Sequence, residues 1–108
     1  MTEQDIYQKI GQLLYEAGPS SAKKIITRAR LFAEDDGGSY EFDYLNDQGK
    51  VEWFQPDGKA VRNLTMLLVD LRKLYVSNGL CENGKAWSAC EITLNLEPVR
   101  ISIDYIYT

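Results

Sequence analysis

Eight carboxylates lie in the 24 residues from Glu34 to Asp57, against a single base, Lys50. This stretch, the acidic segment, has a net formal charge of −7, whereas the whole chain carries −4. Its acids are Glu34, Asp35, Asp36, Glu41, Asp43, Asp47, Glu52 and Asp57, interleaved with Tyr40, Phe42, Tyr44, Trp53 and Phe54. Such a surface suits a basic partner, because a negative field speeds encounter with cations by roughly 10- to 10³-fold. A solvated hairpin face is the other interpretation.

Within this segment, Glu41 and Asp43 are the two residues that most resemble a catalytic or metal-binding pair. Carboxylates two apart on one strand face could act as acid and base or bind a divalent cation. The chain has no histidine and no Gly-rich phosphate loop, and its two cysteines fit no ligand spacing. The run from Asp35 to Gly38 lacks the ligand pattern of an EF-hand. We therefore expect no catalytic, metal or cofactor site, and no cofactor.

Basic residues cluster at one place only, between Ala17 and Ala33, where there is no acid. The cluster consists of Lys23, Lys24, Arg28 and Arg30. It is too small to overcome the net charge, so direct nucleic-acid binding is not expected. Two interpretations remain for this patch: a solvated strand face, or an intramolecular complement to the acids.

Length and composition indicate one domain over residues 1–108, with 44% hydrophobic and 26% charged residues. No apolar run approaches the ~20 residues that span a bilayer, so no membrane contact is expected. The first ten residues are polar and acidic and lack the apolar stretch of a signal peptide. We expect a cytoplasmic protein in which Cys81 and Cys90 stay as thiols.

Two amphipathic helices are predicted. The first is capped by Thr2, with Asp5 in a capping-box position, and stops at Gly18-Pro19. The second runs from about Lys59 to Asn78, with Gly79 at its C-terminal end. Each carries a single apolar stripe, formed by Ile6, Ile10, Leu13, Leu14 and Ala17 in the first and by Val61, Leu64, Leu68, Leu71 and Tyr75 in the second.

Period-two alternation predicts strands from about Lys24 to Ala33, Ser39 to Leu45, Val51 to Trp53, Trp87 to Leu96 and Val99 to Tyr107. Short turns join neighbouring strands, so the strands should pair antiparallel. The expected fold is a two-layer α+β domain of order α-β-β-β-α-β-β, with both helices on one face of a sheet of about five strands. The opposite face should be at least partly open. Trp53 and Trp87 could serve either as core residues or as interface anchors.

Both ends of the chain resemble the YezG-like immunity proteins, which are antitoxins of bacterial polymorphic toxin systems. The opening DIYQKIGQLL, Asp5 to Leu14, is similar to the first helix of that family. The ending WSACEITL, Trp87 to Leu94, followed by VRISIDYIY, Val99 to Tyr107, is similar to its closing hairpin. The resemblance implies a protein that is not an enzyme and that neutralises a cognate toxin domain, often a nuclease, by blocking its active site.

Charge and side-chain type, rather than the family, select the expected partner-binding residues. These are Glu34, Asp35, Asp36, Tyr40, Glu41, Asp43, Glu52 and Trp53. The expected partner is a toxin domain with a basic active-site groove, bound by a monomer. The alternative function is a small acidic secretion chaperone, which should be an obligate dimer with a long apolar groove. A small enzyme is the least favoured class.

Overall fold

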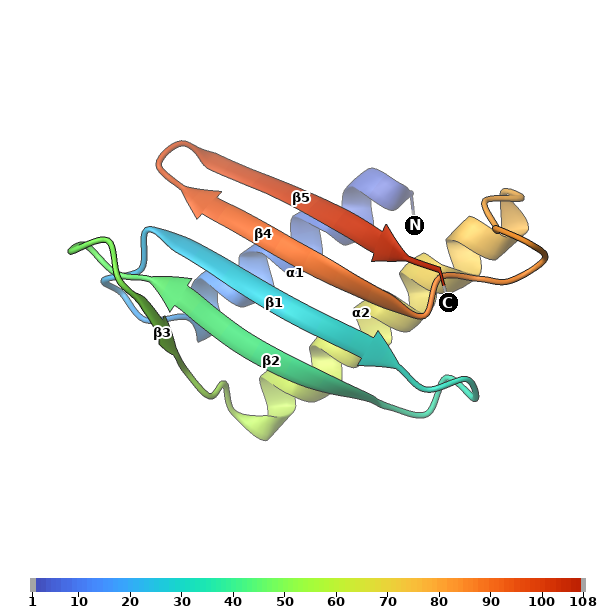
Figure 1. The fold of residues 1–108 in the computed structure, drawn as a ribbon, viewed down its shortest axis with the longest axis horizontal. Coiled ribbons are helices and arrows are strands. Elements are labelled where there is room, and N and C mark those ends of the chain that lie inside the picture. Colours follow the sequence, from blue (N-terminus) through green and yellow to red (C-terminus); the bar gives the residue numbers. More distant parts are fainter. Residues whose placement is uncertain (1, 108) are drawn as a thin grey trace.

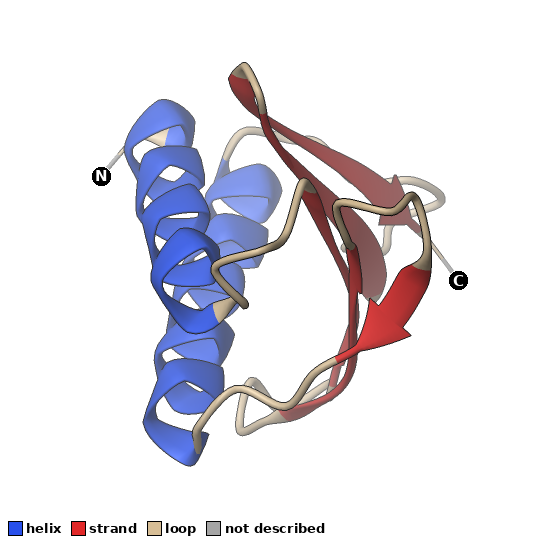
Figure 2. Ribbon diagram, turned by 90° about the vertical axis from the view of Figure 1, so that its left-hand side faces the viewer, coloured by secondary structure: helices blue, strands red, loops and turns tan. Residues whose placement is uncertain are grey.

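The computed structural model describes residues 2–107 and contains two helices and one five-stranded sheet (Figure 1). The elements are α1 (Glu3–Ala17), β1 (Lys24–Leu31), β2 (Gly38–Leu45), β3 (Val51–Trp53), α2 (Gly58–Ser77), β4 (Ala89–Leu96) and β5 (Val99–Ile106). The strand order is β3-β2-β1-β4-β5, and all neighbours are antiparallel. Both helices lie on the same side of the sheet (Figure 2), so the expected two-layer α+β fold is confirmed.

Helix α1 begins and ends where the sequence signals lie. The Thr2 side chain accepts from the Asp5 backbone N–H at 3.1 Å, and the Asp5 carboxylate accepts from the Thr2 N–H at 3.0 Å. This reciprocal pair satisfies two backbone donors that a helix start leaves free. At the other end a Cβ on Gly18 would collide with the terminal methyl of Ile25 in β1, so a larger residue there would force this buried side chain to shift.

Four strands and the second helix differ from their expected bounds by one or two residues; of these, β5 ends at Ile106 instead of Tyr107. β1 ends at Leu31 instead of Ala33, because the chain turns after Phe32, whose carbonyl accepts from the Asp35 N–H at 3.3 Å. β2 begins one residue early, at Gly38, and β4 begins at Ala89, two residues later than expected. Helix α2 spans Gly58–Ser77, capped by Asp57, whose carboxylate accepts from the Ala60 N–H at 2.7 Å. Gly79 has φ +74°, the left-handed conformation expected after a helix.

One apolar core fills the space between the helices and the sheet. Trp87 is fully buried in it, so this tryptophan is a core residue. The other fully buried apolar side chains are Ile6, Ile10 and Leu14 of α1, Leu64, Leu68 and Leu71 of α2, Ile25 of β1, and Cys90, Ile92 and Leu94 of β4. Each buried aliphatic or aromatic side chain contributes about 1.5–3 kcal/mol, so this layer fixes which face of every strand points to solvent.

A tyrosine cluster closes the core where α1, α2 and β5 meet. The hydroxyl oxygens of Tyr7 and Tyr105 are 2.6 Å apart. The Tyr105 ring also packs on Tyr75, with centroids 4.6 Å apart, and on Trp87, at 5.3 Å. Burial, followed by the hydrogen bond with Tyr7, raises the pKa of Tyr105 well above its usual value. Tyr105 is therefore a neutral phenol at ordinary pH values.

Candidate functional site

The sheet face turned away from the helices, named the open face here, carries the charged residues of the central strands. The buried residues of β1 alternate with exposed ones, so Arg28 and Arg30 lie on the open face. Glu41 of β2 and Glu91 of β4 lie directly opposite Arg28, on its two sides. Asp43 lies two residues further along β2, on the same face. The register thus brings three carboxylates from two strands around one guanidinium.

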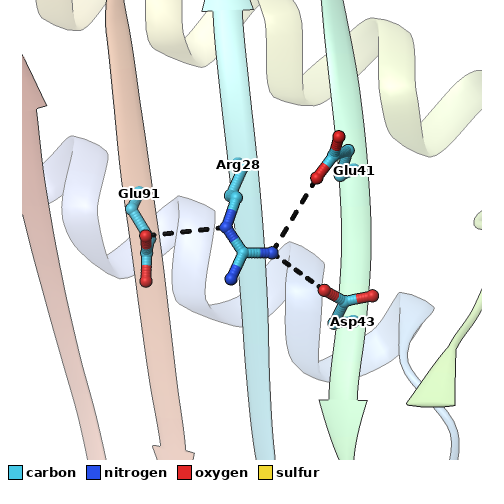
Figure 3. A network of polar contacts seen from close by, with 4 residues as sticks. All are labelled: Arg28, Glu41, Asp43 and Glu91. Carbon is cyan, nitrogen blue, oxygen red and sulfur yellow. Dashed lines mark hydrogen bonds and ion pairs between the residues drawn. The ribbon is translucent and has the colours of Figure 1, made fainter. Parts of the chain in front are cut away.

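Arg28 contacts all three carboxylates (Figure 3). Its Nη1 donates to Asp43 Oδ2 at 2.8 Å and lies 3.9 Å from Glu41 Oε2. Its Nε lies 3.7 Å from Glu91 Oε2. The hydrogen bond from Arg28 to Asp43 is the main cause that raises the pKa of Arg28 above its usual value, with further help from the charges of Glu91 and Glu41. Arg28 therefore stays charged and acts as the centre of the cluster.

Three carboxylates against one guanidinium leave this cluster with a net charge of −2. Of the two interpretations of the basic patch, the intramolecular complement holds for Arg28, and also for Lys23, whose Nζ lies 3.2 Å from Glu97. The acids of β2 are thus partly compensated, but they are not neutralised. Exposed ion pairs of this kind contribute little to stability, about 0–1 kcal/mol each, so their charge remains available to a partner.

Trp53 lies beside the cluster on the neighbouring strand. It pairs directly with Asp43 and is 75% exposed. It is therefore a surface residue, and the core role that the sequence also allowed does not hold for it. Val51, two residues earlier on β3, is 61% exposed. A large indole held on a strand next to charged groups has the composition of an interface anchor.

A shallow hollow of about 430 Å³ lies along the edge of β2, beyond the end of β3. Four of the residues expected to bind a partner line it, namely Tyr40, Glu41, Asp43 and Trp53. The structure therefore brings half of the expected binding residues together. The hollow exists because β3 is only three residues long, which leaves part of the β2 edge uncovered.

The remaining residues expected to bind a partner lie elsewhere. Glu34, Asp35 and Asp36 form the turn between β1 and β2, and Asp35 has φ 60°. Asp35 forms an ion pair with Arg72 of α2, which also donates to the Phe32 carbonyl at 2.7 Å. Because Arg72 is only 7% exposed, Asp35 serves inside the fold by fastening the turn to α2.

Tyr40 and Glu52 belong to the helix side of the sheet. The Tyr40 hydroxyl bonds to Thr65 of α2, and its ring stacks on Phe42 at 5.7 Å. Glu52 lies opposite Tyr44 and accepts a hydrogen bond from its hydroxyl at 2.6 Å. Both side chains are therefore hydrogen-bonded to their neighbours. Tyr40 lines the hollow only at the edge of the sheet.

Two members of the cluster, Arg28 and Glu91, were not among the residues expected to bind a partner. Glu91 is a polar residue between the buried Cys90 and Ile92, which identifies it as a strand residue that faces solvent. Nothing in the sequence says that it pairs with Arg28, because that contact depends on which strands are neighbours. Only the strand order supplies this information.

The open face presents charged side chains and one large exposed aromatic side chain to solvent. Among residues 2–107, no group of three or more Cys, Asp or Glu is arranged to hold a metal ion. No described helix is long and apolar enough to cross a membrane. Comparison of the chain with protein-family models and with curated proteins gave no match. What remains is a solvent-facing sheet that combines surplus negative charge with an exposed tryptophan.

Proposed function

We propose that this protein is a cytoplasmic immunity protein that binds a cognate bacterial toxin domain and blocks its active site. The toxin is a nuclease, or another enzyme whose active-site groove is basic. The immunity protein itself performs no catalysis. In this proposal Trp53 anchors the complex, while Glu41, Asp43 and Glu91 provide the charge that complements the groove.

The observation that carries this proposal is the position of Trp53 beside a cluster with net negative charge. Trp53 is 75% exposed and directly opposite Asp43, so the indole and the carboxylate would be covered by the same partner. Interface hot spots are rich in tryptophan, and charged groups around them set on-rate and specificity. A nuclease groove is built to hold phosphates, so it presents the cations that such a cluster attracts.

The likeness of α1 and the β4–β5 hairpin to YezG-like immunity proteins supports the same function. It concerns the sequence from Asp5 to Leu14 and the two stretches from Trp87 to Leu94 and from Val99 to Tyr107. Apart from Glu91, which belongs to the Arg28 cluster, these parts of the chain lie outside the Trp53 surface. The family resemblance and the surface chemistry are therefore separate lines of support.

The decisive experiment is co-expression with the C-terminal domain of the protein encoded immediately upstream. Host growth is measured with and without this chain. We expect growth to stop when the domain is expressed alone and to recover when this chain is present. A matched variant with Trp53→Ala, Glu41→Gln and Asp43→Asn should restore growth less well. A harmless upstream domain would remove the main support for the immunity function.

The alternative, a secretion chaperone, has one observation in its favour. A groove of about 800 Å³ runs between α1 and β5 and is lined partly by Tyr7, Tyr15, Val99 and Ile101. An extended effector segment could lie in such a groove. This function predicts that the upstream or neighbouring protein is harmless by itself and loses solubility or secretion when this chain is deleted. The growth experiment therefore separates the two functions.

A further inference from the structure

β5 is an edge strand of eight residues, and among residues 2–107 no strand pairs with its outer side (Figure 1). The ladder shows which of its backbone groups are free. Leu31 donates to the Ser88 carbonyl and Leu96 donates to the Lys23 carbonyl, so even-numbered β4 residues bond to β1. Odd-numbered β4 residues then bond to the even-numbered residues of β5. The outward N–H and C=O groups of β5 are those of Val99, Ile101, Ile103 and Tyr105.

Two opposite charges on this strand have no ion-pair partner among residues 2–107. Arg100 and Asp104 are both exposed and lie four residues apart, about 13 Å along an extended strand. They are too far apart to pair with each other. Asp104 lies directly opposite Glu91, and like charges in this position destabilise a sheet. Glu91 has Arg28 on its other side, whereas no ion pair of the described residues compensates Asp104. The free side of Asp104 is the outer edge of β5.

We propose that two copies of the protein pair through β5, antiparallel and about a two-fold axis at Ser102, to form one continuous ten-stranded sheet. In this register Arg100 of each copy lies opposite Asp104 of the other, and Ile101 lies opposite Ile103. Its hydrogen-bonded pairs, Ile101 with Ile103 and Val99 with Tyr105, use the outward backbone groups and give about eight hydrogen bonds. Alternate positions of β5 carry a positive charge at Arg100, no charge at Ser102 and a negative charge at Asp104. Two antiparallel copies of this strand therefore pair opposite charges in this register alone. A shift of two residues removes both ion pairs.

The helix side of the interface also has room for a second copy. A Cβ on Gly11 of α1 would be 3.8 Å from both Leu94 of β4 and Ile101 of β5, so α1 lies above the boundary of these strands. From Gly11 the helix runs obliquely across the strands, with its N-terminal end toward β5 (Figure 1), so in the dimer the first turns of the two α1 helices would approach each other over the paired β5 strands. The two helices would close the groove over Tyr15 and Val99, which are 59% and 71% exposed in the single chain.

The sequence left the oligomeric state open and favoured a monomer, so the proposed dimer differs from that expectation, and it does not depend on the proposed function. Both open faces lie on the same side of the extended sheet, so each copy keeps its Trp53 surface free. A dimer by itself therefore no longer favours the chaperone function, because this dimer fills the groove that a chaperone would need.

The first test is the mass of the wild-type chain by light scattering after size exclusion, followed by charge reversal. We expect a dimer, and we expect Arg100→Asp or Asp104→Arg to weaken it about 10- to 100-fold, since each places two like-charged pairs across the axis. Mixing these two variants should restore a heterodimer, because both cross-axis pairs between positions 100 and 104 then join an acid with a base. Matched controls are Arg62→Asp and Asp70→Arg, which change exposed residues of α2 and should remain dimeric.

The second test is specific for the register. In a Cys81→Ser background, Ser102→Cys should form a disulfide between copies on mild oxidation, since its own copy lies opposite at about 4.5 Å between Cα atoms. Ile106→Cys, on the same strand and face, should not. A wild-type chain that remains monomeric at its highest attainable concentration would overturn the proposal. So would a dimer that is unaffected by both charge reversals, or one that cross-links through residue 106 and not through residue 102.

Discussion

Trp53 and Asp43 lie directly opposite each other on β3 and β2, with both side chains on the sheet face that the helices leave uncovered. Asp43 is held by Arg28 at 2.8 Å, whereas the indole of Trp53 is 75% exposed. The pair therefore combines a fixed charge with a large apolar group that lies mostly in solvent. This combination defines the surface to test first.

Replacing Trp53 with alanine should weaken binding of the proposed toxin partner about 30-fold or more, because tryptophans that become buried in interfaces are typical hot spots. The thermal midpoint of unfolding should hardly change, since the side chain is mostly in solvent. Titration calorimetry and thermal melts measure the two effects. Met66→Ala, which removes a 63% exposed side chain from α2, is the matched control. Equal affinity of both variants would place the interface elsewhere.

The pair of substitutions Glu41→Gln and Asp43→Asn should slow association with the toxin and flatten its dependence on salt. The two neutral residues leave Arg28 with only Glu91 and turn the local charge from −2 to zero. Stopped-flow association rates at low and high ionic strength measure this. Glu16→Gln with Asp70→Asn removes the same charge from the helices and should leave the salt dependence largely intact. An unchanged rate at low salt would argue against this site.

Asp35→Asn should lower the free energy of unfolding by about 1–3 kcal/mol, because it leaves the buried Arg72 without its counterion. Asparagine tolerates the left-handed backbone that Asp35 adopts at φ 60°, so the substitution tests the charge and not the turn. Urea unfolding provides the measurement. Asp36→Asn is the neighbouring control and should cost much less. If the two substitutions cost the same, the ion pair does not stabilise the turn.

The protein should lose stability as the pH rises above about 10, the ordinary pKa of tyrosine. In the folded state the pKa of Tyr105 is raised, so the folded chain keeps a proton that the unfolded chain releases. The contribution of Tyr105 to the free energy of unfolding is therefore complete below about pH 10 and decreases above it. Urea midpoints between about pH 9 and pH 11 should fall, and fall less steeply in Tyr105→Phe. An identical slope for both proteins would assign the alkaline loss to other groups.

Cys90 should resist alkylation in the folded protein at neutral pH. It is buried in β4, and burial raises the pKa of its thiol to about 12, so the reactive thiolate is scarce. Mass spectrometry after brief iodoacetamide treatment should find label on Cys81, which is partly exposed, and almost none on Cys90. Unfolding in urea should expose both thiols and serves as the control. Rapid labelling of Cys90 would mean that β4 opens more easily than its burial suggests.

Local patterns in the sequence were sufficient for the fold class and for most elements. The alternation of Tyr40, Phe42 and Tyr44 with Glu41 and Asp43 correctly divided β2 between core and solvent, because burial of one face fixes the direction of every side chain. The cap at Thr2 and the apolar stripe of α2 correctly placed both helix starts to within one residue. These signals depend only on residues that are close together in the sequence, so they predict the elements without knowledge of the tertiary structure.

The candidate site was only half predictable, because its contacts join strands that are distant along the chain. Arg28 and Glu91 meet only because β1 lies between β2 and β4 in the sheet. Asp35 shared the charge of its neighbours in the acidic segment, but it pairs with Arg72 of α2. The roles of the two tryptophans, which composition cannot distinguish, depend on their place in the sheet. Trp53 lies on a strand of three residues at the sheet edge, whereas Trp87 precedes a central strand.

The shortness of β3 has a consequence for how the sheet can grow. An edge strand can pair with a further chain through its unpaired backbone N–H and C=O groups, and a longer edge strand has more of them. β3 offers three residues, closely followed by Pro56, while β5 at the opposite edge offers eight. Addition by strand pairing is therefore favoured at the β5 edge. Copies joined through β5 have at each outer boundary only β3 and the part of β2 that it leaves uncovered, which is shorter than β5, so we expect the assembly to stop at two chains.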